Sequence, residues 1–252
     1  MTYSIDLSGR RALVTGAGQR VGLAISLALA DAGATVLAND VLPDRAAGAV
    51  AAIAARGGKA EAAPFDVTDY DAVHAGVAAL GDVDILVNNA GHAGVEGWTF
   101  KPFAESTREE WARYFNVNLY GVMNCIHAAL PSMTARGWGR IVTIVSDAAR
   151  SGEPNVAPYS AAKAGAAAFT RSIAREVGRH GVTVNNVSLS TIGFEGMDET
   201  SEQGRRMLKP YIIRRFGKPD DVAPMVTLLA SPLASWITGQ TIPVNGGYTV
   251  NQ

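Results

Sequence analysis

The chain has 252 residues, of which 48% are hydrophobic and 18% charged, and its formal net charge is −1 at pH 7. This balance predicts a globular protein with a large apolar core, and it provides no basic surface for nucleic acid or an anionic membrane. The lone cysteine, Cys125, excludes an internal disulfide and a cysteine-based zinc site, so we expect no metal and a reducing, cytoplasmic location. Met1 to Arg11 lack the apolar stretch of a signal peptide, and no apolar run is long enough for a transmembrane helix, so we expect neither export nor a membrane span.

Short β-rich runs alternate with longer, alanine-rich helical stretches along the whole chain. This pattern predicts an α/β fold in one domain over residues 1–252: a Rossmann-like, doubly wound sheet of about seven parallel strands with helices on both faces. The strands are expected at Arg11–Thr15, Thr35–Asn39, Ala60–Phe65, Ile85–Asn88, Arg140–Val145, Thr183–Ser188 and Gln240–Val244.

The first strand runs into a glycine-rich turn, Thr15 to Gly22, and then into an apolar-periodic helix. Glycines let the backbone turn sharply and approach a pyrophosphate, and the helix start offers free N–H groups. A plain strand-to-helix connection is the alternative interpretation. Asp40 ends the second strand, where a carboxylate can bind both hydroxyls of an adenosine ribose. Its alternative role is to cap a helix that begins near Pro43.

Two further polar runs follow buried strands: Asp66-Val67 after the third, and Asn88-Asn89-Ala90-Gly91 after the fourth. The second run alone reads as a turn. With the glycine-rich turn, however, these runs resemble the short-chain dehydrogenase/reductase family. The resemblance implies cofactor contacts by Gly16, Gln19, Arg20, Val21, Asp40, Asp66, Val67, Asn89, Ala90 and Gly91. Arg20 replaces the family's middle glycine, and its guanidinium can point outward.

The resemblance also implies a cofactor. An acidic residue at the place of Asp40 goes with NAD in this family, because it repels the 2′-phosphate of NADP. The next three residues, Val-Leu-Pro at 41–43, add no cation to offset that repulsion, which leaves Arg20 and Arg45 as the nearby cations. We therefore expect NAD.

A helical stretch from Tyr159 to about Arg179 carries Tyr159 and Lys163 four residues apart, on one helix face. A free tyrosine has a pKa near 10, and a cation at about 4 Å is worth about 4 kcal/mol, enough to lower that pKa by two to three units. A tyrosine packed under a snorkelling lysine is the ordinary structural alternative.

The spacing of two upstream residues strengthens the catalytic interpretation. Ser146 lies thirteen residues before Tyr159, and Asn118 lies twenty-eight before Ser146. These separations match the family's Asn, Ser, Tyr, Lys tetrad. The resemblance implies that Tyr159 is the general acid/base, that Ser146 holds the substrate oxygen, and that Asn118 holds a water. It also implies that Lys163 lowers the tyrosine pKa and that Tyr159 and Lys163 contact the nicotinamide half of the cofactor.

Three segments are expected to wall the substrate pocket: His92–Phe103, Ser151–Val156 and a substrate loop at about 191–215. Their side chains, among them Trp98, Phe100, Glu153, Phe194 and Met197, predict a medium-sized, partly apolar substrate. After the sixth strand the family has Pro-Gly and then a threonine that contacts the pyrophosphate, whereas this chain has Leu189-Ser190 and, at the place of the threonine, Phe194. The Ile192 backbone remains available to the nicotinamide carboxamide.

The sequence therefore predicts an NAD(H)-dependent oxidoreductase that interconverts a secondary alcohol and a ketone, with a small-molecule substrate and no nucleic-acid or membrane partner. An NADPH-dependent 3-oxoacyl thioester reductase is one alternative. A catalytically idle dinucleotide-binding sensor or scaffold is another. The resemblance implies a homotetramer that pairs the helices before and after the fifth strand.

Overall fold

The computed structural model describes residues 4–91 and 101–250, and its strands form one seven-stranded parallel sheet in the order β3-β2-β1-β4-β5-β6-β7. The strands are β1 (Arg11–Val14), β2 (Thr35–Ala38), β3 (Lys59–Ala62), β4 (Ile85–Asn88), β5 (Gly139–Ser146), β6 (Val182–Leu189) and β7 (Thr241–Val244). The predicted Rossmann-like fold is confirmed. The third strand ends three residues before the predicted Phe65, because β3 is an edge strand whose mostly exposed side chains carry no clear apolar pattern.

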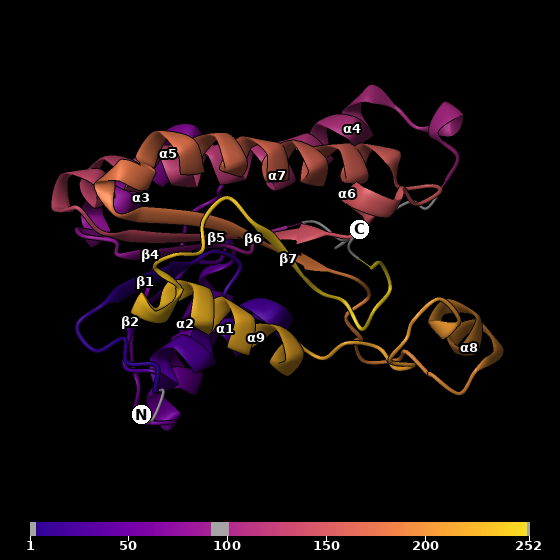
Figure 1. Cartoon of the computed structure of the whole chain (residues 1–252), viewed down its shortest axis with the longest axis horizontal. Coiled ribbons are helices and arrows are strands. Elements are labelled where there is room, and N and C mark those ends of the chain that lie inside the picture. Colours follow the sequence, from indigo (N-terminus) through magenta and orange to yellow (C-terminus); the bar gives the residue numbers. More distant parts are fainter. Residues whose placement is uncertain (1–3, 92–100, 251–252) are drawn as a thin grey trace.

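Helices cover both faces of the sheet (Figure 1). One face carries α1 (Arg20–Asp31), α2 (Pro43–Ala55) and α9 (Pro219–Ala230), and the other carries α3 (Tyr70–Leu80), α5 (Gly121–Arg136) and α7 (Ala157–Val177). The shorter helices are α4 (Arg108–Phe115), α6 (Ala148–Ser151) and α8 (Glu202–Leu208), with 3₁₀ turns at Phe103–Glu105, Gly178–His180 and Pro232–Ala234. No helix of the described ranges is long and apolar enough to cross a bilayer.

Each face of the sheet has its own apolar core. Ile25 of α1, Ile53 of α2 and Leu229 of α9 are fully buried in one core, and Ile126 and Met133 of α5 are buried in the other. Because successive strand residues point to opposite faces, strands covered on both sides must be apolar throughout. That requirement is why the central strands were visible in the sequence as continuous apolar runs.

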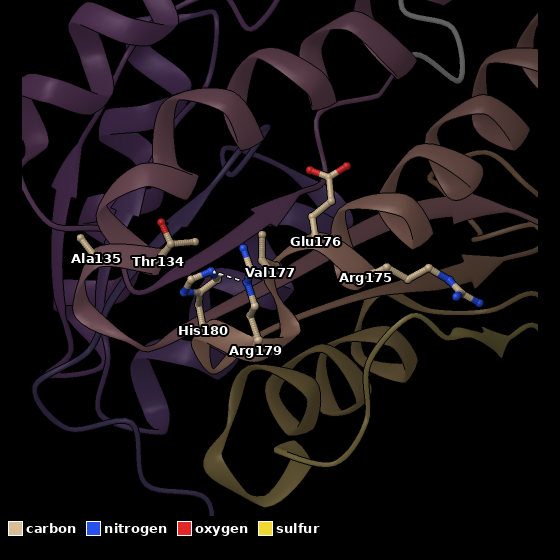
Figure 2. Close-up of a pocket in the computed structure, with 7 residues that line it drawn as sticks. All are labelled: Thr134, Ala135, Arg175, Glu176, Val177, Arg179 and His180. Atoms are coloured by element: carbon tan, nitrogen blue, oxygen red, sulfur yellow. Dashed lines mark hydrogen bonds between the residues drawn. The ribbon is translucent and has the colours of Figure 1, made fainter.

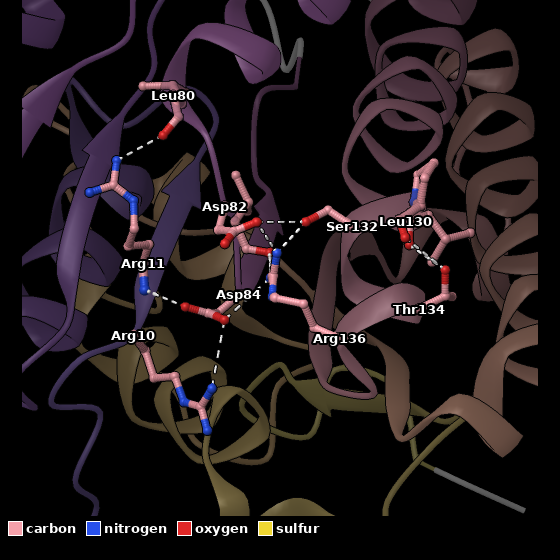
Figure 3. A network of polar contacts seen from close by, with 11 residues as sticks. Arg10, Arg11, Leu80, Asp82, Asp84, Leu130, Ser132, Thr134 and Arg136 are labelled. Carbon is pink, nitrogen blue, oxygen red and sulfur yellow. Dashed lines mark hydrogen bonds and ion pairs between the residues drawn. The ribbon is translucent and has the colours of Figure 1, made fainter.

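A polar network lies at the end of the sheet where the strands begin (Figure 3). The Asp84 carboxylate accepts from the Arg11 backbone N–H at 2.9 Å and from Arg136 Nη2 at 3.3 Å, and it pairs with Arg10 at 3.6 Å. Arg136 also donates to the Val83 carbonyl at 2.8 Å. These contacts tie β1, β4 and α5 together at the amino ends of the strands, away from the carboxyl ends where ligands bind in such folds.

The segment after β6 extends beyond the layered body of the molecule and carries α8 (Figure 1). It has a small apolar cluster of its own, made by Leu208, Tyr211 and Phe216 with Met197 and Tyr248 packed against them. The predicted substrate loop is therefore partly helical. Met197, expected to face substrate, packs against this cluster.

Candidate active site

The glycine-rich turn after β1 leaves almost no room for side chains. Gly16 has a φ of +62°, and a Cβ added at Gly22 would collide with the Gly16 carbonyl. The Asn89 side-chain amide donates to the carbonyls of Thr15 at 2.9 Å and Gly16 at 3.1 Å, and the Ala90 N–H donates to Thr15 Oγ1 at 2.9 Å. The turn and the Asn-Ala-Gly run therefore form one rigid cradle at the start of α1, which fits a bound pyrophosphate.

Arg20 is the first residue of α1 and adopts the left-handed conformation, with a φ of +48°. Its Nη2 donates to the Ile192 carbonyl at 3.2 Å, and its guanidinium carbon lies 5.1 Å from the centre of the Phe194 ring. The side chain, which from the sequence could have pointed outward, instead reaches the segment that follows β6.

Asp40 is buried directly after β2. Its Oδ2 accepts from the Gly18 N–H at 3.3 Å and its Oδ1 from the Leu42 N–H at 3.1 Å. The alternative of a helix cap is wrong, because the residue that caps α2 is Leu42, without a side-chain hydrogen bond. Each carboxylate oxygen can accept more than one hydrogen bond, so Asp40 can hold the turn and still bind a ribose hydroxyl.

The other polar runs also follow the carboxyl ends of strands, β3 and β4. Asp66 accepts from the N–H and hydroxyl of Thr68 at 2.8 and 2.9 Å, and the carbonyl of buried Val67 accepts from Asn124 at 3.0 Å. The Asn88 amide donates to Thr143 Oγ1 of β5 at 3.3 Å. This last bond gives the first asparagine of its run the strand-linking position that the resemblance implies.

Ser146 is the last residue of β5, and Tyr159 and Lys163 lie on the first turns of α7. The Ser146 side chain hydrogen-bonds to the Tyr159 phenol, and its Oγ also accepts from the Ala148 N–H at 3.2 Å. These bonds fix the serine hydroxyl between the strand end and the tyrosine.

Lys163 and Asn118 meet at Gly91. A Cβ at Gly91 would lie 3.1 Å from Lys163 Nζ and 3.2 Å from Asn118 Oδ1. Asn118 is fully buried in a π-helical turn, Asn116–Tyr120, between α4 and α5, and its amide donates to the Tyr114 carbonyl at 3.0 Å. The structure thus brings the Asn-Ala-Gly run against two of the four predicted catalytic residues, and the hydrogen bond between Ser146 and Tyr159 joins the other two.

Burial governs the charges of this site. It raises the pKa of the Tyr159 phenol, an effect that Ser146 opposes and nearby Glu153 reinforces. Burial also lowers the pKa of Lys163 to about 8, and the Lys163 Nζ donates to the Ile144 carbonyl at 2.8 Å. The ammonium is directed at a strand carbonyl in this structure, and the lowering of the tyrosine pKa by lysine stays a prediction.

Sequence reasoning missed Tyr114, and for Asp147 it offered only the tuning of the pocket or the cap of a turn. Tyr114 of α4 packs edge-on against Tyr159, with ring centres 6.3 Å apart. Asp147, fully buried beside Ser146, accepts from Ser188, from Asn245 at 2.5 Å and from Thr249 at 2.8 Å. Spacing alone gave no signal for these contacts, since they depend on residues far apart in the chain.

The structure describes part of the predicted walls of the substrate pocket. Asn155 and Val156 line a small cleft between α4 and the start of α7. Most of His92–Phe103, including Trp98 and Phe100, lies outside the described residues. No group of three or more possible metal-ligating side chains occurs in residues 4–91 and 101–250.

A separate open depression lies at the far ends of α5 and α7 (Figure 2). It is lined by Thr134, Ala135, Arg175, Glu176, Val177, Arg179 and His180. Arg175 is twelve residues beyond Lys163 on α7, so at 1.5 Å per residue the depression is roughly 20 Å from the tetrad. It contains none of the predicted site residues.

The fold and the site together define a Rossmann-type dinucleotide oxidoreductase. A family model described as enoyl-(acyl carrier protein) reductase matches residues 16–249. The chain is 34% identical over 250 residues to 7alpha-hydroxysteroid dehydrogenase of Escherichia coli (strain K12), covering 97% of this chain and 96% of that one. The chain belongs to the short-chain dehydrogenase/reductase family, and it is an oxidoreductase that interconverts a secondary alcohol and a ketone.

Two solved structures are similar over nearly the whole chain. Gluconate 5-dehydrogenase from Burkholderia cenocepacia, in complex with NADP and tartrate, has a TM-score of 0.90 at 32% identity, covering 98% of each chain. A 3-oxoacyl-[acyl-carrier protein] reductase from Brucella melitensis, with bound NAD, has a TM-score of 0.90 at 32% identity, covering 97% of this chain and 93% of that one. Similar structures thus occur with either dinucleotide.

Proposed function

We propose that the chain is an NAD(H)-dependent dehydrogenase in which Tyr159 is the general acid/base and Ser146, Lys163 and Asn118 are its catalytic partners. The observation that carries this proposal is the hydrogen bond between Ser146 and Tyr159 at the carboxyl end of β5. A substrate oxygen placed between the two side chains would be held by the serine hydroxyl and lie within reach of the phenol.

The bound nicotinamide accepts or donates the hydride. In alcohol oxidation, the carbon loses a hydride and its hydroxyl loses a proton to Tyr159, so a ketone forms. In the reverse reaction Tyr159 returns the proton to the substrate oxygen. Because burial raises its pKa, the phenol is protonated at neutral pH in the ligand-free protein, which is the form needed for ketone reduction.

Lys163 and Asn118 have supporting roles in this proposal. Both side chains flank Gly91 in the cradle, so the ammonium can reach a ribose hydroxyl of a bound dinucleotide. A buried ammonium with a pKa near 8 can also exchange protons close to neutral pH. The buried Asn118 carbonyl can accept from a water that connects Lys163 to solvent.

Asp40 supports NAD over NADP. Its carboxylate is fixed at the end of β2 by the Gly18 and Leu42 N–H groups, so it cannot easily swing away from a 2′-phosphate. Two like charges at this place repel each other. The remaining proposed cofactor contacts are those of the cradle and of the Ile192 backbone.

The experiment is a panel of secondary alcohols and ketones assayed with NAD(H) and with NADP(H) by absorbance of the reduced cofactor. We expect turnover with NAD(H), loss of turnover in Tyr159→Phe, and normal turnover in the control Tyr120→Phe, whose side chain is 52% exposed. A strong preference for NADPH with 3-oxoacyl thioesters would instead support a thioester reductase. Cofactor binding without turnover across the panel would support an idle sensor.

Substrate, location and assembly are also part of the proposal. Exposed apolar side chains on the segment after β6, among them Phe194, Met207 and Ile213, support a medium-sized, partly apolar substrate bound by residues 191–215. The free, buried Cys125 is consistent with a reducing cytoplasm. We also infer a homotetramer built on α5 and α7, which size-exclusion chromatography with light scattering would test.

A further inference from the structure

Two departures from the family's sequence pattern touch each other in space. Arg20 stands at the place of the middle glycine, and Phe194 at the place of the threonine after β6. The Arg20 guanidinium donates to the Ile192 carbonyl at 3.2 Å and lies 5.1 Å from the centre of the Phe194 ring. The two positions are 174 residues apart in the sequence, so the structure alone reveals that the two changes belong together.

This contact spans the crevice in which a dinucleotide binds. In the sheet order, β1 and β6 are separated by β4 and β5. With neighbouring strands about 4.8 Å apart, the loops that carry Arg20 and Ile192 leave the sheet roughly 14 Å from each other. Ligands of such sheets lie beyond the carboxyl ends of the strands at the switch point. The Arg20 side chain therefore reaches over the strand ends where the diphosphate would lie.

The chemistry of the guanidinium suits a diphosphate. A guanidinium has five N–H donors in a planar fork that matches phosphate oxygens, and among the described residues Arg20 uses one donor, on Ile192. A phenylalanine at 194 cannot donate the hydrogen bond that a threonine hydroxyl would. The backbone at Arg20 keeps the left-handed conformation that suits glycine, so the turn retains its shape while it gains a cation.

We infer that Arg20 binds the cofactor's diphosphate on the side that faces away from the strand ends, and that it holds the Ile192–Phe194 segment over the diphosphate. It thereby replaces the hydrogen bond of the missing threonine hydroxyl. The inference rests on the proposed function, because it requires a dinucleotide in the cradle. It makes Arg20 a binding residue specific to this chain, in which one side chain joins the glycine-rich turn to the substrate loop.

Calorimetric titration with ADP-ribose and with NAD⁺ tests this inference, since ADP-ribose contains the diphosphate and lacks the nicotinamide. In Arg20→Gly we expect both affinities to fall by about tenfold or more, because a hydrogen-bonded charge on the ligand is lost. The melting temperature of the ligand-free variant should change little, because relief of the positive φ offsets the loss of the hydrogen bond to the Ile192 carbonyl. The matched control is Arg56→Ala at the end of α2, whose side chain is 52% exposed and pairs with Asp31; its ADP-ribose affinity should not change.

Three results would overturn the inference while leaving the proposed function intact. Unchanged ADP-ribose affinity in Arg20→Gly would show that the guanidinium does not bind the diphosphate. Tighter binding would show that Arg20 obstructs the crevice. A loss of affinity confined to NADP⁺, titrated in the same way as a third ligand, would make Arg20 a ligand of the 2′-phosphate. Failure of the unaltered protein to bind any of these nucleotides would refute the proposed function itself, and the inference with it.

Discussion

Replacing Lys163 with methionine should abolish turnover and at the same time remove a penalty to stability that the wild-type protein carries. The Lys163 side chain is 4% exposed, and among residues 4–91 and 101–250 its Nζ has one hydrogen bond, to the Ile144 carbonyl at 2.8 Å. A buried ammonium with so little compensation is costly, which is why burial lowers its pKa from 10.5 to about 8. Methionine has a similar length and no charge.

The magnitude follows from linkage between proton binding and folding. The unfolded chain binds this proton more tightly than the folded chain, so the free energy of unfolding rises as pH rises through the window between about 8 and 10.5. At pH 7 the full penalty applies and amounts to about 3 kcal/mol. By pH 9.5 about 2 kcal/mol of stability should be regained. The lost hydrogen bond to Ile144, worth about 1.5–3 kcal/mol, offsets part of the gain in the methionine variant.

The assay is urea unfolding of the ligand-free protein at several pH values from 7 to 9.5, for the wild type, for Lys163→Met and for the control Lys209→Met, whose residue lies on the exposed surface. The difference between wild type and Lys163→Met should shrink or change sign as pH rises, by about 2 kcal/mol, whereas the control should track the wild type. A pH-independent difference would refute the reasoning, because it would mean that Lys163 titrates alike in the folded and unfolded chains.

Three further predictions concern the cradle and its supports. Gly91→Ala should lower both cofactor affinity and kcat/KM, measured by titration and initial rates, because its Cβ would press on the ammonium of Lys163; wild-type values would contradict the proposed packing. Asp84→Ala should lower the free energy of unfolding, measured with urea, by about 2–3 kcal/mol and leave kcat unchanged, because the network at the amino ends of the strands is remote from the site. A large loss of kcat would mean that the two ends of the sheet are coupled. Asp147→Asn should lower the free energy of unfolding by about 1–3 kcal/mol and speed hydrogen exchange in residues 245–249. The reason is that one amide oxygen cannot accept from every donor that the carboxylate binds.

The central strands could be predicted from the sequence because their burial on both faces demands unbroken apolar runs. The strand at Ile85–Asn88 was predicted to the residue, and β5 and β6 were each one residue longer at both ends than predicted. The edge strand β3 was misplaced because Lys59 and Glu61 need not be apolar where water covers the strand. Helix α8 escaped notice because it packs on a small local cluster rather than on the sheet.

The four proposed catalytic residues could be expected to lie near one another because they keep the family's spacings along the chain, and their catalytic roles stay a prediction. The sequence could not show that burial raises the pKa of Tyr159, that Ser146 opposes this effect and that Glu153 reinforces it, because no spacing rule conveys these contributions. The π-helical turn that aims Asn118 was equally hidden, because a single wide turn leaves the apolar period almost unchanged.

Asp147, the neighbour of the proposed catalytic Ser146, is bound by residues that follow β7, so we expect that segment to influence the site. The adjacent Asp147 carboxylate binds Ser188 of β6, and also Asn245 and Thr249 beyond β7. A buried carboxylate tolerates few arrangements of its donors, since each unsatisfied group is costly. Movement of the C-terminal segment would therefore disturb Asp147 and, through the shared backbone, the serine hydroxyl. Arg20 couples the cofactor turn to the substrate loop in a comparable way, so each half of the crevice is held by a residue that the spacing of the tetrad does not reveal.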